Sequence, residues 1–197
     1  FFDTTGRYLL PLWAPASIGL ALSIDRLRRF GPAISAGALA LLLAFQVGTV
    51  VRLTQSERGL QFQLVERLQI PTRYDAPLID FLMENGYTRG YASYWTAYRI
   101  AFRSHEQVIL DSILPYMDEL VGVDTNRYPP YVEAVAAADR VVWITQNYPA
   151  LDRAIEAALA EAGVRYRVRD FGPYRVYYDL SRRISPRDVT LTLSDEG

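Results

Sequence analysis

Cysteine and lysine are both absent from this chain of 197 residues, and histidine occurs only once. Without cysteine the chain forms no disulfide and no thiolate metal site, and a single histidine cannot build a His-rich metal cluster. Arginine supplies all 21 positive charges, a bias typical of a GC-rich bacterial genome. We therefore predict no metal site and no cofactor.

The chain also lacks a large excess of positive or negative charge. The formal net charge is -1, and no stretch gathers the dense basic face of a nucleic-acid-binding protein. The chain also lacks the motifs GxGxxG, GxxxxGK[ST], GxSxG and HExxH, so nucleotide binding and serine or zinc hydrolysis have no support. We predict no nucleic-acid partner and assign no catalytic residue.

Two uncharged apolar stretches dominate the first quarter of the chain. They cover residues 8–24 and 32–51, which are 17 and 20 residues long. A bilayer core about 30 Å thick is crossed by roughly 20 apolar helical residues, so both lengths predict transmembrane helices. Pro11 and Pro15 weaken the first helix locally, and two buried helices of a soluble core are the alternative reading.

The connector between these stretches carries Arg26, Arg28 and Arg29. Positive residues in short loops stay in the cytoplasm, so both ends of the hairpin should face outward. We predict a protein of the plasma (inner) membrane, with the lipid bilayer as its first partner. The predicted organisation is a transmembrane hairpin over 1–53, a stalk helix and linker over 54–71, and an extracytoplasmic domain over 72–197.

Strand and helix signals alternate in the distal domain. Apolar periodicity, Pro at helix starts and Gly at helix ends predict helices near 75–84, 96–103, 130–138 and 149–162. Runs rich in aromatic and β-branched residues predict strands at 90–95, 108–110, 140–145, 164–170 and 174–180, with a weak one at 189–193. The fold class is therefore α/β, with a mainly parallel sheet and a C-terminal antiparallel hairpin around residues 171–173.

Ligands of open α/β sheets bind beyond the carboxyl ends of the strands. That edge should carry Tyr94 and Trp95 after the first strand, Asp111 after the second and Gln146 after the third. Aromatic faces beside carboxylates and amides suit a sugar, so we predict these four residues as substrate-binding. Half-buried packing of the aromatic side chains is the alternative.

Three further residues are isolated candidates. Arg127 could hold an anion through its fork of donors or could form an ordinary salt bridge. His105 is expected to be a turn residue and not a catalyst, since no Asp or Ser partner can be placed beside it. Arg7, at the outer end of the first apolar stretch, is expected to anchor the helix or to contact a lipid phosphate.

The run 6–15, GRYLLPLWAP, resembles late-helix segments of GT-C type membrane glycosyltransferases, including protein mannosyltransferase-like and aminoarabinose-transferase-like proteins. The order of Tyr91 to Tyr98, Phe102, residues 106–108 and RYPPY at 127–131 is similar to the C-terminal extracytoplasmic domain of such bacterial proteins. The resemblance implies a polyprenyl-phosphate sugar donor and a saccharide or protein acceptor. It also implies a catalytic acidic loop upstream of Phe1, with Arg7 contacting the carrier phosphate.

Two other functions stay open. The chain could be a non-catalytic, membrane-anchored module that binds a saccharide or a protein through its aromatic strand end. It could also be a soluble α/β enzyme, if the apolar stretches are core helices.

Overall fold

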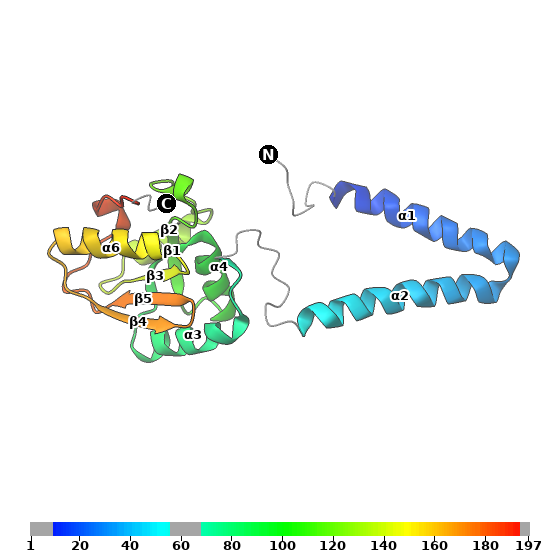
Figure 1. Cartoon of the computed structure of the whole chain (residues 1–197), viewed down its shortest axis with the longest axis horizontal. Coiled ribbons are helices and arrows are strands. Elements are labelled where there is room, and N and C mark those ends of the chain that lie inside the picture. Colours follow the sequence, from blue (N-terminus) through cyan, green and yellow to red (C-terminus); the bar gives the residue numbers. More distant parts are fainter. Residues whose placement is uncertain (1–9, 56–67, 194–197) are drawn as a thin grey trace. The chain divides into compact units, whose positions relative to one another are not determined.

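The structure, a computed structural model, describes residues 10–55 and 68–193. The chain divides into two compact units, residues 1–64 and 65–197, which are described separately below (Figure 1). Most of the predicted stalk helix, residues 56–67, lies outside the described residues.

The first unit contains two helices joined by a tight turn. Helix α1 spans Leu10–Arg26, a 3-10 helix spans Leu27–Phe30, and helix α2 spans Pro32–Thr54. Gly31 between them has a φ of 130°, in the region that favours glycine, and Pro32 then begins α2 at a position where no backbone donor is needed. The Ser35 hydroxyl donates to the Ile24 carbonyl oxygen over 3.0 Å and ties the start of α2 to the end of α1.

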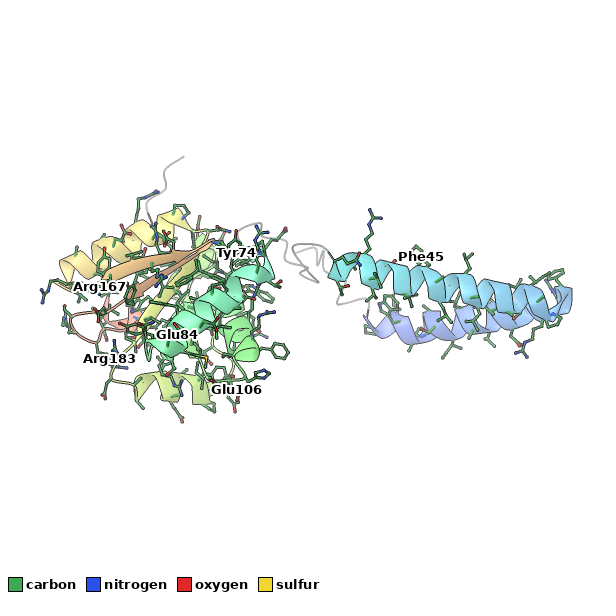
Figure 2. All side chains as sticks on the ribbon, turned by 90° about the horizontal axis from the view of Figure 1, so that it is seen from below. Phe45, Tyr74, Glu84, Glu106, Arg167 and Arg183 are labelled. Atoms are coloured by element: carbon green, nitrogen blue, oxygen red, sulfur yellow. The ribbon has the colours of Figure 1, made fainter. Side chains whose placement is uncertain are left out.

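Only α2, with 23 residues, is long and apolar enough among the described residues to cross a membrane. A signal sequence near the N-terminus would meet the same criterion. Helix α1 has 17 residues, and its last turn holds Asp25 and Arg26. The prediction of two transmembrane helices is thus supported for one of them by length and composition. The apolar side chains of both helices remain largely exposed, as Phe45 illustrates at 70% exposure (Figure 2).

The second unit is an α/β domain with a five-stranded sheet in the order β2-β1-β3-β5-β4. The strands are Arg89–Ser93 (β1), Ile109–Leu114 (β2), Val142–Gln146 (β3), Arg167–Phe171 (β4) and Tyr174–Tyr178 (β5). The helices are Asp75–Glu84 (α3), Tyr94–Arg103 (α4), Pro129–Ala136 (α5) and Pro149–Glu161 (α6). Short 3-10 helices cover Thr72–Tyr74, Asp118–Leu120 and Pro186–Asp188.

The sheet separates two hydrophobic cores. Strand residues alternate between the faces: Ile144 packs in the core beneath α3 and α4, and its neighbour Trp143 packs in the core beneath α5 and α6. Gly90 on β1 is required by this packing, because a Cβ there would lie 2.2 Å from the carbonyl oxygen of Val142 on β3. The result is a three-layer arrangement of helices, sheet and helices.

Three expectations need correction. The sheet is mixed and not mainly parallel: β1 pairs parallel with β2 and β3, whereas β5 pairs antiparallel with β3 and β4. The second strand runs four residues further than predicted, through Leu114. Residues 189–193 form no strand, although Val189, Leu191 and Leu193 alternate in packing against the core. The predicted antiparallel turn at residues 171–173 is confirmed by the β4–β5 pairing.

Candidate functional site

The connections out of β1 and β3 run in opposite directions across the sheet. Strand β1 leads through α4 to β2, and β3 leads through α6 toward β4 on the other side. Ligands of doubly wound sheets bind beyond the carboxyl ends of such a strand pair. The edge formed by the carboxyl ends of β1 and β3 is therefore the expected place for a ligand.

That edge is closed by a buried polar network. The Gln146 side chain donates to the Ser93 hydroxyl over 2.8 Å, and its oxygen accepts from the Thr96 hydroxyl. All three side chains are buried, with exposures of 2 to 4%. Gln146, predicted to bind substrate, therefore has its amide occupied by its own neighbours and joins β3 to the start of α4.

The crevice outside this network is small. It is lined by Ser93, Leu114, Pro115, Tyr116, Ile144, Thr145, Gln146, Tyr148 and Leu151, and these side chains leave a cavity volume of about 0 Å³. Pockets for small molecules usually measure about 300 to 1,000 Å³. A sugar ring would therefore have to rest on the surface beside this crevice and not inside it.

Six aromatic rings form a continuous chain at the same edge. In order they are Tyr116, Trp95, Tyr94, Tyr98, Tyr131 and Tyr128, with successive ring centroids 4.9 to 6.4 Å apart. We call them the aromatic cluster. They come from the first turns of α4, from the loop after β2 and from the start of α5. The sequence segments around Tyr94 and Tyr128, predicted as two separate sites, are thus brought together.

The rings of the aromatic cluster differ in how far they are exposed. Tyr131 is buried, Tyr94 and Tyr98 are half-buried, and Trp95 and Tyr128 are exposed at 40% and 49%. The alternative reading, that these aromatic side chains pack, therefore holds for the middle of the cluster. Its two exposed rings remain able to stack on a ligand.

Polar groups fix the cluster from behind. The Tyr131 hydroxyl donates to a Glu106 carboxylate oxygen over 2.9 Å, and burial together with this carboxylate raises the pKa of Tyr131 to about 12. Tyr131 is therefore a neutral donor at physiological pH. The Arg127 backbone N–H donates to the Tyr98 hydroxyl over 3.0 Å, and the Arg127 guanidinium lies 5.6 Å from the centroid of the Tyr94 ring.

Arg127 is exposed and forms no ion pair with any residue that the structure describes. Its guanidinium lies beside the aromatic cluster and keeps its donors accessible. An anionic group on a ligand stacked against Trp95 or Tyr94 could be bound there. The predicted salt-bridge role of Arg127 is not seen within the described part of the chain.

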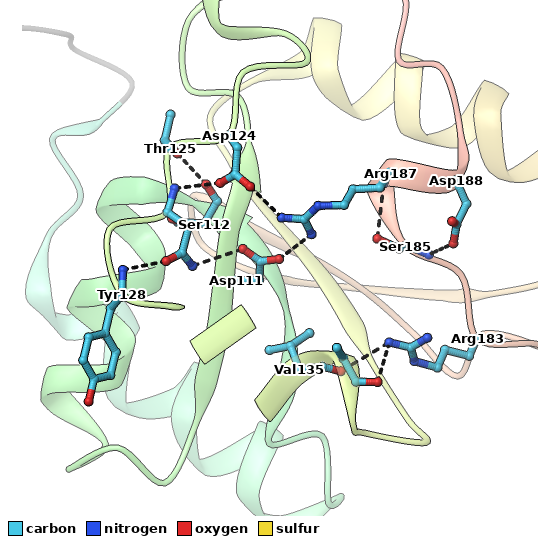
Figure 3. Close-up of polar contacts among 12 residues, drawn as sticks. Asp111, Ser112, Asp124, Thr125, Tyr128, Val135, Arg183, Ser185, Arg187 and Asp188 are labelled. Carbon is cyan, nitrogen blue, oxygen red and sulfur yellow. Dashed lines mark hydrogen bonds and ion pairs between the residues drawn. The ribbon is translucent and has the colours of Figure 1, made fainter. Parts of the chain in front are cut away.

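Asp111, a second predicted substrate ligand, has a structural role here. Its side chain is 1% exposed and accepts from Arg187 over 2.6 Å and from the Asn126 amide over 3.2 Å. Arg187 also binds Asp124 over 2.9 Å, so it bridges two carboxylates and attaches the C-terminal segment to β2 (Figure 3). Asp111 lies within β2 and not after it, which is why its carboxylate does not reach the aromatic cluster.

Two predicted residues, Arg7 and His105, and one residue that was not predicted, Tyr116, complete the comparison with the sequence. Arg7 lies outside the described residues. His105 is exposed in the turn after α4 with a φ of 52°, as expected of a turn residue. Tyr116 was missed by sequence reasoning, although its position just after β2 could have suggested it. No group of His, Asp and Glu residues suited to a metal ion occurs within residues 10–55 and 68–193.

Comparison of the chain with protein-family models, with curated proteins and with solved structures finds no match.

Proposed function

We propose that residues 65–197 form a non-catalytic saccharide-binding domain, held outside the cytoplasm by a membrane anchor. The observation that carries this proposal is the aromatic cluster, in which Trp95 and Tyr128 are exposed and the Tyr94 ring lies 5.6 Å from the Arg127 guanidinium. Sugar rings present C–H faces that stack on aromatic rings, and a phosphate or carboxylate on the same ligand would meet the guanidinium.

The resemblance to GT-C type enzymes supplies the context for this binding. In that context the domain belongs to an integral-membrane glycosyltransferase of the plasma membrane that uses a polyprenyl-phosphate-linked sugar. In such an enzyme this domain would hold the donor glycan or the acceptor. Alkaline phosphatase fused to the C-terminus should be active, whereas a reporter that works only in the cytoplasm should be inactive when fused at the same place.

Saccharide binding can be tested with the full chain in lipid nanodiscs. Purification should avoid detergents with sugar head groups, because these would occupy the site. Saturation-transfer NMR with methyl mannoside, methyl galactoside and N-acetylglucosamine should show saturation of ring C–H protons. We expect Trp95→Ala to weaken binding about tenfold, which corresponds to ~1.4 kcal/mol.

The matched control is Phe102→Ala. Phe102 is an exposed aromatic residue on the same helix, but it contacts no ring of the aromatic cluster. Its removal should leave sugar binding unchanged. Equal losses from both variants, or no saturation with any of the three sugars, would contradict the proposal.

A further inference from the structure

The outer face of α4 presents apolar rings that the domain does not cover. Thr96, Ala97, Ile100 and Ala101 point inward and are buried, and the opposite side of the helix carries Trp95, Arg99, Phe102 and Arg103. We call these four residues the outer face of α4. Phe102 is 83% exposed, and none of the described rings stacks on it. Trp95 and Phe102 are seven residues apart and therefore share one side of the helix, and exposed apolar side chains gathered on one side of an element mark an interaction surface.

Two arginines accompany these rings. Arg99 and Arg103 both bind one carboxylate, that of Asp75, over 2.9 and 3.0 Å. One negative charge meets two positive charges, so the outer face of α4 keeps an excess of positive charge. Arg103 retains 41% of its side-chain exposure and can reach an anion outside the domain without leaving Asp75.

This face also adjoins the point where the chain joins the domain. The Arg99 guanidinium donates to the Ile70 carbonyl oxygen over 3.0 Å, and Ile70 is buried. Fifteen residues, 55–69, lie between Thr54 at the end of the apolar helix α2 and Ile70. Fifteen residues span at most about 54 Å when fully extended, which limits how far the domain lies from the end of α2.

We propose that the outer face of α4 docks on the lipid bilayer, with Trp95 and Phe102 in the interfacial layer and the arginines at the phosphate groups. Aromatic residues and arginine are the side chains that membrane interfaces favour. Docking would hold the aromatic cluster, which shares Trp95, at the depth of a lipid-linked sugar. The inference rests on the proposed membrane attachment, and the test below separates the two.

The absence of cysteine permits single nitroxide labels on the full chain. Three variants are placed in nanodiscs of phosphatidylcholine and phosphatidylglycerol: Phe102→Cys, Glu161→Cys on α6 as the control, and Leu43→Cys on α2. Phe102 and Glu161 are both exposed, so neither label disturbs the core. Collision of each label with oxygen and with a water-soluble nickel complex is then measured by EPR.

We expect the label at position 102 to favour oxygen, which shifts its depth parameter to positive values, while the label at 161 stays water-like. A larger shift with more phosphatidylglycerol would support the role of the arginines. Water-like behaviour at both positions, or equal immersion of both, overturns the proposal. Dipolar broadening at position 102 without oxygen preference would indicate a second copy of the chain and overturns it too. If the label at position 43 is immersed and the label at 102 is water-like, the docking proposal is refuted but the membrane anchor is not. If the label at 43 is itself water-like, the membrane anchor is refuted.

Discussion

Replacing Asp75 by alanine should destabilise the distal domain more than replacing any exposed charged residue by alanine. Its carboxylate is fully buried, accepts from Arg99 over 2.9 Å and from the Tyr174 hydroxyl over 2.9 Å, and forms an ion pair with Arg103 over 3.0 Å. The network therefore connects α3, α4 and β5 through a single side chain. Burial raises the pKa of Tyr174, so its hydroxyl stays a donor and would lose its acceptor.

The size of the loss follows from what remains buried. Removing one partner of a buried ion pair costs about 3 to 5 kcal/mol, because the other charge is left uncompensated. Arg99 keeps only 18% of its side-chain exposure, but Arg103 keeps 41% and can regain water. We therefore expect the lower half of the range, about 3 to 4 kcal/mol, from a total stability of about 5 to 15 kcal/mol.

Urea unfolding of the full chain, followed by near-UV circular dichroism, measures this effect. With a slope of about 2 kcal/mol per molar urea, the midpoint should fall by about 1.5 to 2 M. The control is Asp170→Ala, which removes an exposed partner of Arg175 and should cost about 1 kcal/mol or less. Equal midpoints for the two variants would show that the Asp75 network does not stabilise the domain.

Three further changes test the packing of the domain. Arg187→Ala leaves the buried Asp111 carboxylate without its cation, and because Arg187 is partly exposed we expect a loss of about 2 to 3 kcal/mol in urea unfolding, with faster amide exchange over residues 184–189. Gly90→Ala places a Cβ against the Val142 carbonyl oxygen, so β1 and β3 must separate and the midpoint should fall by about 1 M or more; an unchanged midpoint would refute that close approach. Burial alone would raise the pKa of Asp124, but hydrogen bonds from the Asn126 N–H and from Arg187 outweigh it and hold this pKa below its ordinary value of 3.8. The stability contributed by the Asp124–Arg187 pair should therefore be fully present above pH 3.8 and lost as the pH falls through the lower pKa of folded Asp124, which amide exchange of residues 184–189, measured from pH 5 downward and corrected for the intrinsic exchange rate, would detect.

Local signals predicted most of the helices and strands. Pro149 and Gly163 bound a helix with apolar residues at helical spacing, and the structure places α6 between them. Asp111 was predicted to follow the second strand, because a charged residue directly after an apolar run is a local signal for the end of a strand. It is instead buried inside β2, because Arg187, 76 residues away in the sequence, neutralises its carboxylate. Such a partner is set by tertiary structure and leaves no local signal.

At residues 189–193 the alternating pattern predicted a strand that does not form. Val189, Leu191 and Leu193 do face the core, as a strand pattern indicates. Alternation reports which side chains are buried, but a strand also needs a neighbour with free backbone groups. No described strand pairs with this segment. Tertiary structure also decides that the sheet is mixed. Strand β5, and not β4, lies beside β3, so β5 forms antiparallel pairs with both β3 and β4.

The candidate site was predicted in part for a physical reason. Parallel strands bring their carboxyl ends to one edge, so residues that follow β1 and β2 had to meet, and Trp95 and Tyr116 do. Which of them stays exposed could not be predicted, because exposure depends on the loop that leads into α5. The loop places the start of α5 so that Tyr131 covers Tyr98, whereas Trp95 stays open.

Helix α4 links the three features from which the proposed sugar binding and membrane docking are argued. Its first turns carry Tyr94 and Trp95 of the aromatic cluster, its middle binds the Asp75 carboxylate and the Ile70 carbonyl through Arg99, and its last turn exposes Phe102. A helix needed only for packing would gain solubility from a polar residue at position 102, at no cost to the core. The buried ion pair holds this helix in one orientation relative to the incoming chain, so the exposed rings face a fixed direction. Rigid support for exposed aromatic residues is what a docking or binding surface requires, and it would be superfluous on a face meant only for water.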